Sequence, residues 1–394
     1  MLVLLNTEKS VKEDKRLRLY GFKRFIYGNV PVIVGQFWVY FNIEGENNLS
    51  ITLKEIGEKV GVSKSTVRRA LQNQPMISFE TKEKVLQAVK EYNYEPNVLA
   101  RGLLKVKTYT LGVIITDIGS SYYSKIVRGI EDEAEKRDYS VLLYNSDRNI
   151  GKLQRCIKEL KRRAVDGIMI APFNDETESF QDLKREKFPF ILFNSEIKME
   201  AEQVFSDDLT GAFMMTEYLI KLGHRRIGYI TTSMQDSQAQ SKLEGYKMAL
   251  QKHNLDWDDA LVETCTSGYT HESGYNATNN LLKMRHRPSA IFAVSDFVAL
   301  GALEAAKEAG LMVPRDISIA GYDDREDIIS LVKPRLTTVA TPKEELGIAA
   351  TKALIKEIDR EEKEREYSSI KLKPRLVIRE SVDIYCGDCP PGKG

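Results

Sequence analysis

Polar and basic side chains near residue 65 have the composition of a surface that reads DNA. A helix predicted from Lys64 to Gln72 buries one apolar face, made of Val67, Ala70 and Leu71. Its solvent face carries Lys64, Ser65, Arg68 and Arg69. Arginine and small polar side chains have defined hydrogen-bonding partners on base edges in the major groove. The pattern therefore predicts a groove-reading helix, and the alternative is an ordinary helical hairpin.

Two neighbouring helices would position this one. The preceding segment is amphipathic, with one apolar face formed by Leu53, Ile56 and Val60. Gly61 suits the left-handed conformation that ends a helix, and the Ser63 hydroxyl can accept an unpaired backbone N–H of the next one. Ser78 can cap a third helix. The apolar stripe of that helix is predicted to contain Val85, Leu86, Val89 and Tyr92.

The charge is distributed unevenly along the 394 residues, although the net charge is only +1. Residues 49–107 contain eleven Lys or Arg and six Asp or Glu, whereas the chain after residue 107 is acidic. A basic N-terminal module on an acidic body is the electrostatic footprint of a DNA-binding head. A non-specific basic surface is the alternative. The length permits two or three domains.

The sequence contains no motif that argues for catalysis, a cofactor or a metal. The four cysteines are Cys156, Cys265, Cys386 and Cys389, and such sparse use is typical of a reducing cytoplasm. Cys386 and Cys389 have C-x-x-C spacing, but no second pair of ligands accompanies them, as a zinc site would need. No HExxH, P-loop or G-x-S-x-G sequence occurs. We expect a cytoplasmic protein that is not an enzyme.

Residues 1–48 do not conform to the rest of the chain. They contain a basic run from Lys12 to Arg24 and an apolar run at 31–43. The apolar run is shorter than the about 20 residues that span a membrane, and no small-residue cleavage site follows it. Our interpretation is a mis-assigned start, with translation beginning at Leu49 from a TTG codon behind purine-rich codons at 44–46. A genuine extension is the alternative.

The stretch at 51–72 and the one at 94–108 together resemble the LacI family of bacterial transcription repressors. That family opens with a pattern like TLKDIA-x-x-AGVSxSTVSRVLN and continues through a YxPNxxARxL hinge. The matching hinge residues are Tyr94, Pro96, Asn97, Ala100, Arg101 and Leu103. The resemblance extends to about residue 381. It implies an all-α helix-turn-helix head at 49–95, a hinge at 96–107, a two-lobed effector-binding and dimerisation domain at 108–381, and a flexible tail at 382–394.

The resemblance also implies roles for single residues in DNA binding. Lys64, Ser65 and Arg69 match base-reading positions of the family. Thr52, Ser63 and Thr66 are expected to contact phosphates, which position a head without specifying sequence. Asn97 and Leu103 lie in the hinge, and Leu103 matches a leucine wedged into the minor groove. Arg68 replaces the usual serine, and it would either read a guanine or hold a phosphate.

The body alternates apolar runs with amphipathic helices, as parallel sheets covered on both faces do. The predicted strands are at 111–116, 139–145, 166–171, 188–194, 226–231, 289–294 and 317–322. This order fits the α/β two-lobed, periplasmic-binding-protein-like fold of the family. Lobe one would hold about 108–205 and return near 338–365, and lobe two about 206–335. Ligands in such sheets bind beyond the carboxyl ends of the strands.

The loops at these strand ends supply candidate effector-binding residues. They are Tyr122, Tyr123, Asn145, Asp147, Asn194, Gln240, Tyr269, Ser295, Asp296 and Asp323. Carboxylates and amides suit a polyhydroxyl ligand because each can bind two hydroxyls, and family aromatics pack on sugar faces. The alternative for each is a loop or capping role. Gln240 and Ser295 replace the usual arginine and asparagine, which predicts an atypical ligand or a regulator driven by a protein.

The resemblance implies a homodimeric repressor that binds a pseudo-palindromic double-stranded operator and responds to a small-molecule effector of sugar type. One alternative is a catabolite-control regulator that responds to a phosphorylated carrier protein, because the stretches ARGL and NSD-x-N resemble that branch. Others are a solute-binding protein or an enzyme of the same fold. No membrane association is expected.

Overall fold

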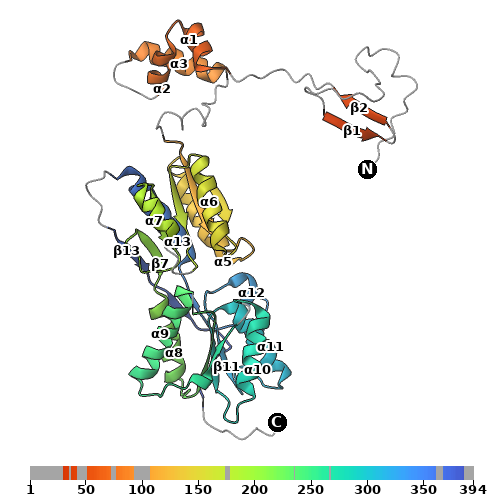
Figure 1. Cartoon of the computed structure of the whole chain (residues 1–394). Coiled ribbons are helices and arrows are strands. Elements are labelled where there is room, and N and C mark those ends of the chain that lie inside the picture. The colour runs from red at the N-terminus through yellow and green to blue at the C-terminus, as the bar shows by residue number, and fades with distance from the viewer. Residues whose placement is uncertain are drawn as a thin grey trace. The chain divides into compact units, whose positions relative to one another are not determined.

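The computed structural model describes residues 30–34, 37–41, 51–71, 77–92, 107–173, 178–234, 236–265, 268–360 and 367–385. The chain divides into two compact units, residues 1–97 and 98–394 (Figure 1). Several predictions fall outside the described residues: the proposed start at Leu49, the hinge residues Asn97 and Leu103, and the Cys386–Cys389 pair. None of the described helices is long and apolar enough to cross a membrane.

Part of the non-conforming N-terminal segment forms an antiparallel strand pair. β1 (Val30–Val34) pairs with β2 (Phe37–Phe41), so the apolar run at 31–43 lies mostly within this pair. Whether translation begins at Leu49 stays a prediction.

Three short helices form the first unit's helical head, and their boundaries follow from local capping. α1 (Leu53–Val60) begins with a capping box between Thr52 and Glu55, and it ends at Gly61, whose φ of 73° is left-handed. α2 (Lys64–Leu71) begins where the Ser63 hydroxyl accepts the Thr66 N–H at 3.1 Å. α3 (Phe79–Glu91) begins at Ser78, which accepts the Thr81 N–H at 3.3 Å. The helix boundaries predicted from Gly61, Ser63 and Ser78 are confirmed.

The head core is a small cluster of Ile56, Val67, Ala70, Val85 and Ala88. The predicted stripe on α3 is partly wrong. Leu86 is 42% exposed and Tyr92 is 37% exposed. Residues at i, i+3 and i+4 share a helix face, so Ala88 and Val89 lie beside Val85, whereas Leu86 is turned away. Tyr92 instead lies beneath the Lys59 ammonium, 4.6 Å from its ring centre.

Lobe one of the second unit is built on a six-stranded parallel sheet in the order β13-β7-β6-β5-β3-β4. Its strands are β3 (Thr110–Ile115), β4 (Ser140–Asn145), β5 (Gly167–Ile170), β6 (Phe190–Phe193), β7 (Gln203–Ser206) and β13 (Ser369–Leu372). Helices α5 (Tyr122–Glu135) and α13 (Lys343–Asp359) cover one face, and α6 (Ile150–Arg162) and α7 (Glu178–Arg185) cover the other. Successive residues of β3 therefore point to opposite faces of the sheet. Val113 packs in the core beneath α5 and α13, and Ile114 packs in the core beneath α6 and α7.

Lobe two is built on a four-stranded parallel sheet in the order β11-β10-β8-β9. Its strands are β8 (Ile227–Thr231), β9 (Val262–Thr264), β10 (Ala290–Ala293) and β11 (Ser318–Ala320). Helices α8 (Asp208–Lys221) and α9 (Ser237–Lys252) contribute to one core, and α10 (His271–Leu282) and α11 (Asp296–Glu308) to the other. Short elements complete it: η1 (Asp259–Leu261), α12 (Glu326–Ile329), and the antiparallel pair β12 (Thr338–Ala340) and β14 (Arg375–Val377).

The chain passes between the lobes three times: after β7, after β12, and between β13 and β14 (Figure 1). Every predicted strand overlaps an observed strand. The sequence predicts that the chain returns to lobe one near 338–365. In the structure the returning segment extends further, through β13 to Leu372. The tail boundary at 382 is also wrong. Val382 is buried in the core of lobe two, and the Tyr385 N–H donates to the Leu222 carbonyl at 2.8 Å.

Candidate functional site

The exposed face of α2 is strongly basic. Lys64, Ser65 and Arg69 are exposed and Arg68 is half-buried, whereas Val67 and Ala70 are buried. The sequence of α2, KSTVRRAL, contains no acidic residue. Its three cations make no ion pair with any residue that the structure describes. This face therefore offers unneutralised positive charge to a polyanion such as DNA.

The hydroxyls predicted to contact phosphates already have partners within the head. Ser63 Oγ lies 2.7 Å from Ser65 Oγ and 2.9 Å from Thr66 Oγ1. The Thr52 N–H and hydroxyl donate to Glu55 Oε2 at 2.7 and 2.9 Å. These bonds lower the pKa of Glu55, so a carboxylate occupies the N-terminus of α1. The phosphate role of Thr52 stays a prediction, and it would require rearrangement of this capping box.

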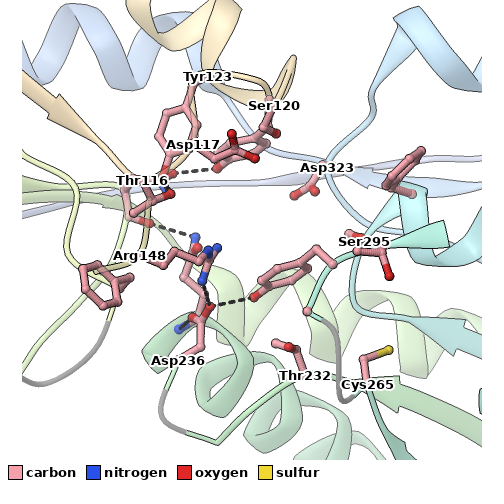
Figure 2. Close-up of a pocket in the computed structure, with 18 of the residues that line it drawn as sticks. Thr116, Asp117, Ser120, Tyr123, Arg148, Thr232, Asp236, Cys265, Ser295 and Asp323 are labelled. Carbon is pink, nitrogen blue, oxygen red and sulfur yellow. Dashed lines mark hydrogen bonds and ion pairs between the residues drawn. The ribbon is translucent and has the colours of Figure 1, made fainter. Parts of the chain in front are cut away.

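A cavity of about 640 Å³ lies between the lobes of the second unit, lined by residues from both (Figure 2). Every lining segment follows the carboxyl end of a strand, because parallel strands of both sheets end toward this crevice. Six predicted residues line the cavity: Tyr122, Tyr123, Asn194, Tyr269, Ser295 and Asp323. The prediction that strand-end loops form a pocket agrees with this geometry.

Four predicted residues do not line the cavity. Gln240 is exposed and donates to the Met234 carbonyl. Asn145 and Asp147 bond to each other, and Asp147 also pairs with Lys152 on the outer surface. Asp296 is fully buried behind the cavity. Its side chain accepts hydrogen bonds from the Thr338 hydroxyl and the Arg325 N–H, at 2.5 and 2.7 Å, so each carboxylate oxygen already has a partner in the protein.

The sequence reasoning missed several lining residues, above all Arg148, Asp236, Gln238, Lys242, Phe297 and Arg325. Lys242 lies on α9 and is only 3% exposed, whereas Gln240, two residues earlier, faces solvent. Two residues correspond to about 200° around a helix, so the two side chains point in opposite directions. The helical phase of α9 could have identified Lys242 instead of Gln240.

One side of the cavity is closed by bonds between the lobes. Arg148 of lobe one pairs with Asp236 of lobe two at 3.0 Å, and the Tyr269 hydroxyl donates to the same carboxylate oxygen at 3.0 Å (Figure 2). The Arg148 guanidinium also lies 5.1 Å from the Tyr269 ring centre. Burial lowers the pKa of Arg148, but the Asp236 charge, its hydrogen bond and the neighbouring Tyr269 and Tyr123 together outweigh burial and raise the pKa. Gln238 adds a bond to the Asn194 carbonyl at 2.9 Å.

A second set of bonds also joins the two lobes. Arg325 of lobe two donates to the Ser121 hydroxyl oxygen at 2.5 Å, and Lys125 pairs with Glu326 at 2.9 Å. The Ser121 hydroxyl in turn donates to Asp327 at 2.6 Å. Two sets of polar contacts thus connect the lobes beside the cavity.

Asp323 faces the cavity with an uncommitted carboxylate (Figure 2). Its backbone has a φ of 105°, and its N–H donates to the Val339 carbonyl at 2.8 Å. Its carboxylate accepts no hydrogen bond from the described residues. Burial raises its pKa, and the charges of Lys242 and Lys343 oppose this rise. A ligand that donates hydrogen bonds could therefore bind the free acceptor positions of this carboxylate.

Buried polar groups connect the cavity to the crossings between the lobes. Asp208, at the first crossing, accepts from the Tyr322 hydroxyl at 3.0 Å and from Gln238 Nε2 at 3.2 Å. Burial raises the pKa of Asp208 to about 6. Burial and the Asp323 charge raise the pKa of Asp296 to about 7. Among the described residues, no group of His, Cys, Asp or Glu is arranged to hold a metal ion.

Comparisons with known proteins agree with both parts of the structure. Residues 52–97 match the family described as bacterial regulatory proteins, lacI family, and residues 216–382 match a periplasmic binding protein-like domain. The chain is 33% identical over 336 residues to the catabolite control protein A of Priestia megaterium, covering 85% of this chain and 100% of that protein. It is also 32% identical over 333 residues to the ribose operon repressor of Escherichia coli, and this match covers 84% of this chain and 99% of that protein.

Solved structures resemble the chain over similar lengths. The lac repressor dimer bound to operator and the anti-inducer ONPF has a TM-score of 0.74 at 26% identity, covering 84% of this chain and 99% of that one. A LacI family regulator from Enterococcus faecium with bound ribose has a TM-score of 0.62 at 31% identity, covering 70% and 99%.

These findings confirm the predicted fold class and function. The match to the lacI family head opposes a solute-binding protein. The near-equal identities to catabolite control protein A and to a ribose operon repressor do not favour the carrier-protein alternative. With its helix-turn-helix head and two-lobed ligand-binding body, the chain belongs to the LacI family of DNA-binding transcription regulators.

Proposed function

We propose that this protein is a homodimeric, cytoplasmic repressor whose operator affinity is controlled by a sugar or sugar derivative bound between its lobes. The observation that carries the proposal is the uncommitted Asp323 carboxylate in the cavity of about 640 Å³ between the lobes. Small-molecule sites in proteins commonly enclose about 300–1,000 Å³. A carboxylate offers two oxygens and accepts only, so two adjacent ligand hydroxyls match it.

The other walls of the cavity suit the same ligand class. Ser295 Oγ accepts the Val298 N–H, which leaves its own proton for a ligand oxygen. Phe173, Tyr269 and Phe297 line the cavity and provide apolar faces for the carbon skeleton of a sugar ring. The similar regulator from Enterococcus faecium, whose structure contains bound ribose, supports a pentose or hexose as the first class to test.

A ligand in this cavity touches both lobes, so its binding free energy depends on how the lobes are placed. A ligand shifts a conformational equilibrium only by its difference in affinity between the two states. Contacts to Asn194 on lobe one and Asp323 on lobe two supply such a difference. The change would reach the DNA through the hinge at 96–107, where Leu103 is proposed to wedge into the minor groove.

The head would bind one half-site through α2, with Lys64, Ser65 and Arg69 reading bases. The two-fold symmetry of a homodimer would be mirrored in a pseudo-palindromic operator. The cations of α2 support this assignment, because they make no ion pair within the described head and lie on one exposed face.

Ligand binding is tested on the full chain by thermal shift and calorimetry with ribose, glucose and cellobiose. The diagnostic variant is Asp323→Asn, because asparagine tolerates the positive φ of this position better than alanine does. Loss of a charge-assisted hydrogen bond costs about 1.5–3 kcal/mol, so affinity should fall roughly tenfold or more. The matched control is Asp132→Asn on the outer side of α5, where the carboxylate pairs with Arg128.

DNA control is tested by gel shift of the full chain on the intergenic DNA upstream of its gene, with and without the sugar that binds. The expected result is specific retardation whose midpoint changes when the sugar is added. A sugar that binds but leaves the midpoint unchanged would contradict effector control. Equal affinity for the upstream DNA and for random DNA would contradict operator binding.

A further inference from the structure

The three cations that line the cavity are all engaged by the protein itself. Lys242 is 3% exposed, donates to the Val294 carbonyl at 3.3 Å, and lies 4.0 Å from the Tyr322 ring centre. Arg325 bonds to the Ser121 hydroxyl and lies 3.7 Å from the Asp327 carboxylate. The third, Arg148, is held by Asp236.

Of these three cations, Arg148 is the one most accessible to a ligand, because its side chain lines the cavity and is 43% exposed. Asp236, its partner, is almost fully buried. Asp236 Oδ1 accepts the Gln238 N–H at 3.0 Å and so caps α9, whereas Oδ2 accepts from Arg148 and from the Tyr269 hydroxyl. Both oxygens of the carboxylate are therefore used, and one of them neutralises the guanidinium.

Two carboxylates that line the cavity have oxygens that accept no hydrogen bond from the described residues. The Asp323 carboxylate has no hydrogen-bond partner among the described residues, and Asp117 uses only Oδ1, which accepts the Gly119 N–H at 2.8 Å. A phosphate group in this cavity would meet these carboxylates, while the nearest arginine is already paired. Like charges placed together in a desolvated site cost free energy, which is how binding sites reject unwanted ligands.

We infer that Asp236 is a specificity-determining residue, which neutralises Arg148 and thereby makes the cavity select uncharged ligands over phosphorylated ones. The inference rests on the proposed ligand-binding role of this cavity and narrows it. It also predicts that removal of the Asp236 charge leaves Arg148 free to bind a phosphate group in the cavity. An unpaired arginine provides up to five donors in a geometry that matches phosphate oxygens.

The test is the Asp236→Asn variant of the full chain, titrated with ribose 5-phosphate and with inorganic phosphate at constant ionic strength. Asparagine caps helices about as well as aspartate, so the start of α9 is retained. Asp236→Ser is a second neutral, cap-competent variant for the case in which the first folds poorly. A new charge-assisted bond from Arg148 should tighten phosphate binding about tenfold to a hundredfold.

The matched control is Asp258→Asn. Asp258 also caps a helical turn, by accepting the Ala260 N–H at 3.1 Å, and its other oxygen pairs with an arginine, Arg226, at 3.2 Å. It lies outside the cavity. Freeing Arg226 should therefore give no comparable gain. The double variant Arg148→Gln/Asp236→Asn should lose the gain, because the freed cation is gone.

Each outcome decides the inference. Wild-type protein that binds ribose 5-phosphate as tightly as ribose would overturn it, as would neutral variants at 236 with unchanged phosphate affinity. A gain of equal size in Asp258→Asn, or one that survives removal of Arg148, would also overturn it. If the neutral variants gain phosphate binding while no uncharged sugar binds the wild type, the sugar proposal fails and the role of Asp236 stands.

Discussion

Replacing Asp296 with asparagine should change how the stability of the body depends on pH. Asp296 is fully buried at the start of α11, and burial together with the Asp323 charge raises its pKa from 3.8 to about 7. The introduced asparagine can accept the Arg325 N–H through its oxygen and donate to the Thr338 hydroxyl through its nitrogen. The substitution therefore keeps the bond from Arg325, replaces the bond with Thr338 by one of reversed direction, and removes the titration.

The sign and size follow from the raised pKa. Between the unfolded value of 3.8 and the folded value of about 7, the folded protein retains a proton that the unfolded chain has lost. The free energy of unfolding then decreases as pH rises through this window. One bound proton changes the free energy of unfolding by about 1.36 kcal/mol per pH unit. The free energy of unfolding of the wild type should therefore fall by about 2 kcal/mol between about pH 5 and pH 7 because of Asp296.

The assay is urea unfolding of the full chain at several values between about pH 5 and pH 7, with the wild type and Asp296→Asn compared at each. The stability of the variant relative to the wild type should rise by about 2 kcal/mol across this range. The control is Asp316→Asn. Bonds with Arg315 and the Met312 N–H lower the pKa of Asp316, so this carboxylate is ionised in both the folded and the unfolded chain between about pH 5 and pH 7 and adds no pH dependence to the free energy of unfolding there. Parallel pH profiles for wild type and Asp296→Asn would refute the reasoning.

Three further substitutions, one of them with a control substitution, test the head and the body. Ile56→Ala removes a fully buried side chain from the small head core and should lower the free energy of unfolding of the head by about 2–4 kcal/mol. Operator binding in gel shifts should then be lost while the body keeps its thermal transition. Unchanged operator binding would contradict this prediction. Gly245→Ala would place a Cβ 2.1 Å from the Leu209 carbonyl oxygen and force α8 and α9 apart, so the melting temperature should fall by several degrees. Gly151→Ala, whose Cβ would meet its nearest atom only at 3.4 Å, should leave it nearly unchanged. Arg68→Ser should reduce the salt dependence of operator binding by about one counterion, and it should weaken binding to operator and to random DNA alike, as expected for a phosphate contact. A loss of affinity confined to the operator would instead show that Arg68 reads a base.

Much of the fold could be predicted because buried parallel strands have a distinctive composition. The apolar runs around Val113 and Ile191 lie between helices on both faces, so residues that point to either face of the sheet are apolar. β9 and β13 lack this signal. Ser369–Leu372 is an edge strand with mostly exposed side chains, and its place in the sheet is set by pairing with β7, not by composition.

The candidate site was predicted at the level of loops and not of side chains. The loops around Tyr122, Tyr269 and Asp323 line the cavity as expected. Asp296 does not, because its neighbour Ser295 points toward the cavity while its own side chain points into the protein. The Arg148–Asp236 pair joins residues 88 apart in the chain and on different lobes. Such a pair exists only after both sheets have formed, so local sequence carries no sign of it.

The interleaving of the two lobes has a consequence for synthesis of the chain. The head is complete by residue 92 and depends only on local helix packing. Lobe one gains its covering helix α13 and its edge strand only at residue 372, and lobe two gains Val382 later still. A growing chain can therefore fold its DNA-binding part at once, whereas the sensing part must wait for nearly the last residue. A transcript broken late in the gene would thus yield a head that folds without a functional sensor.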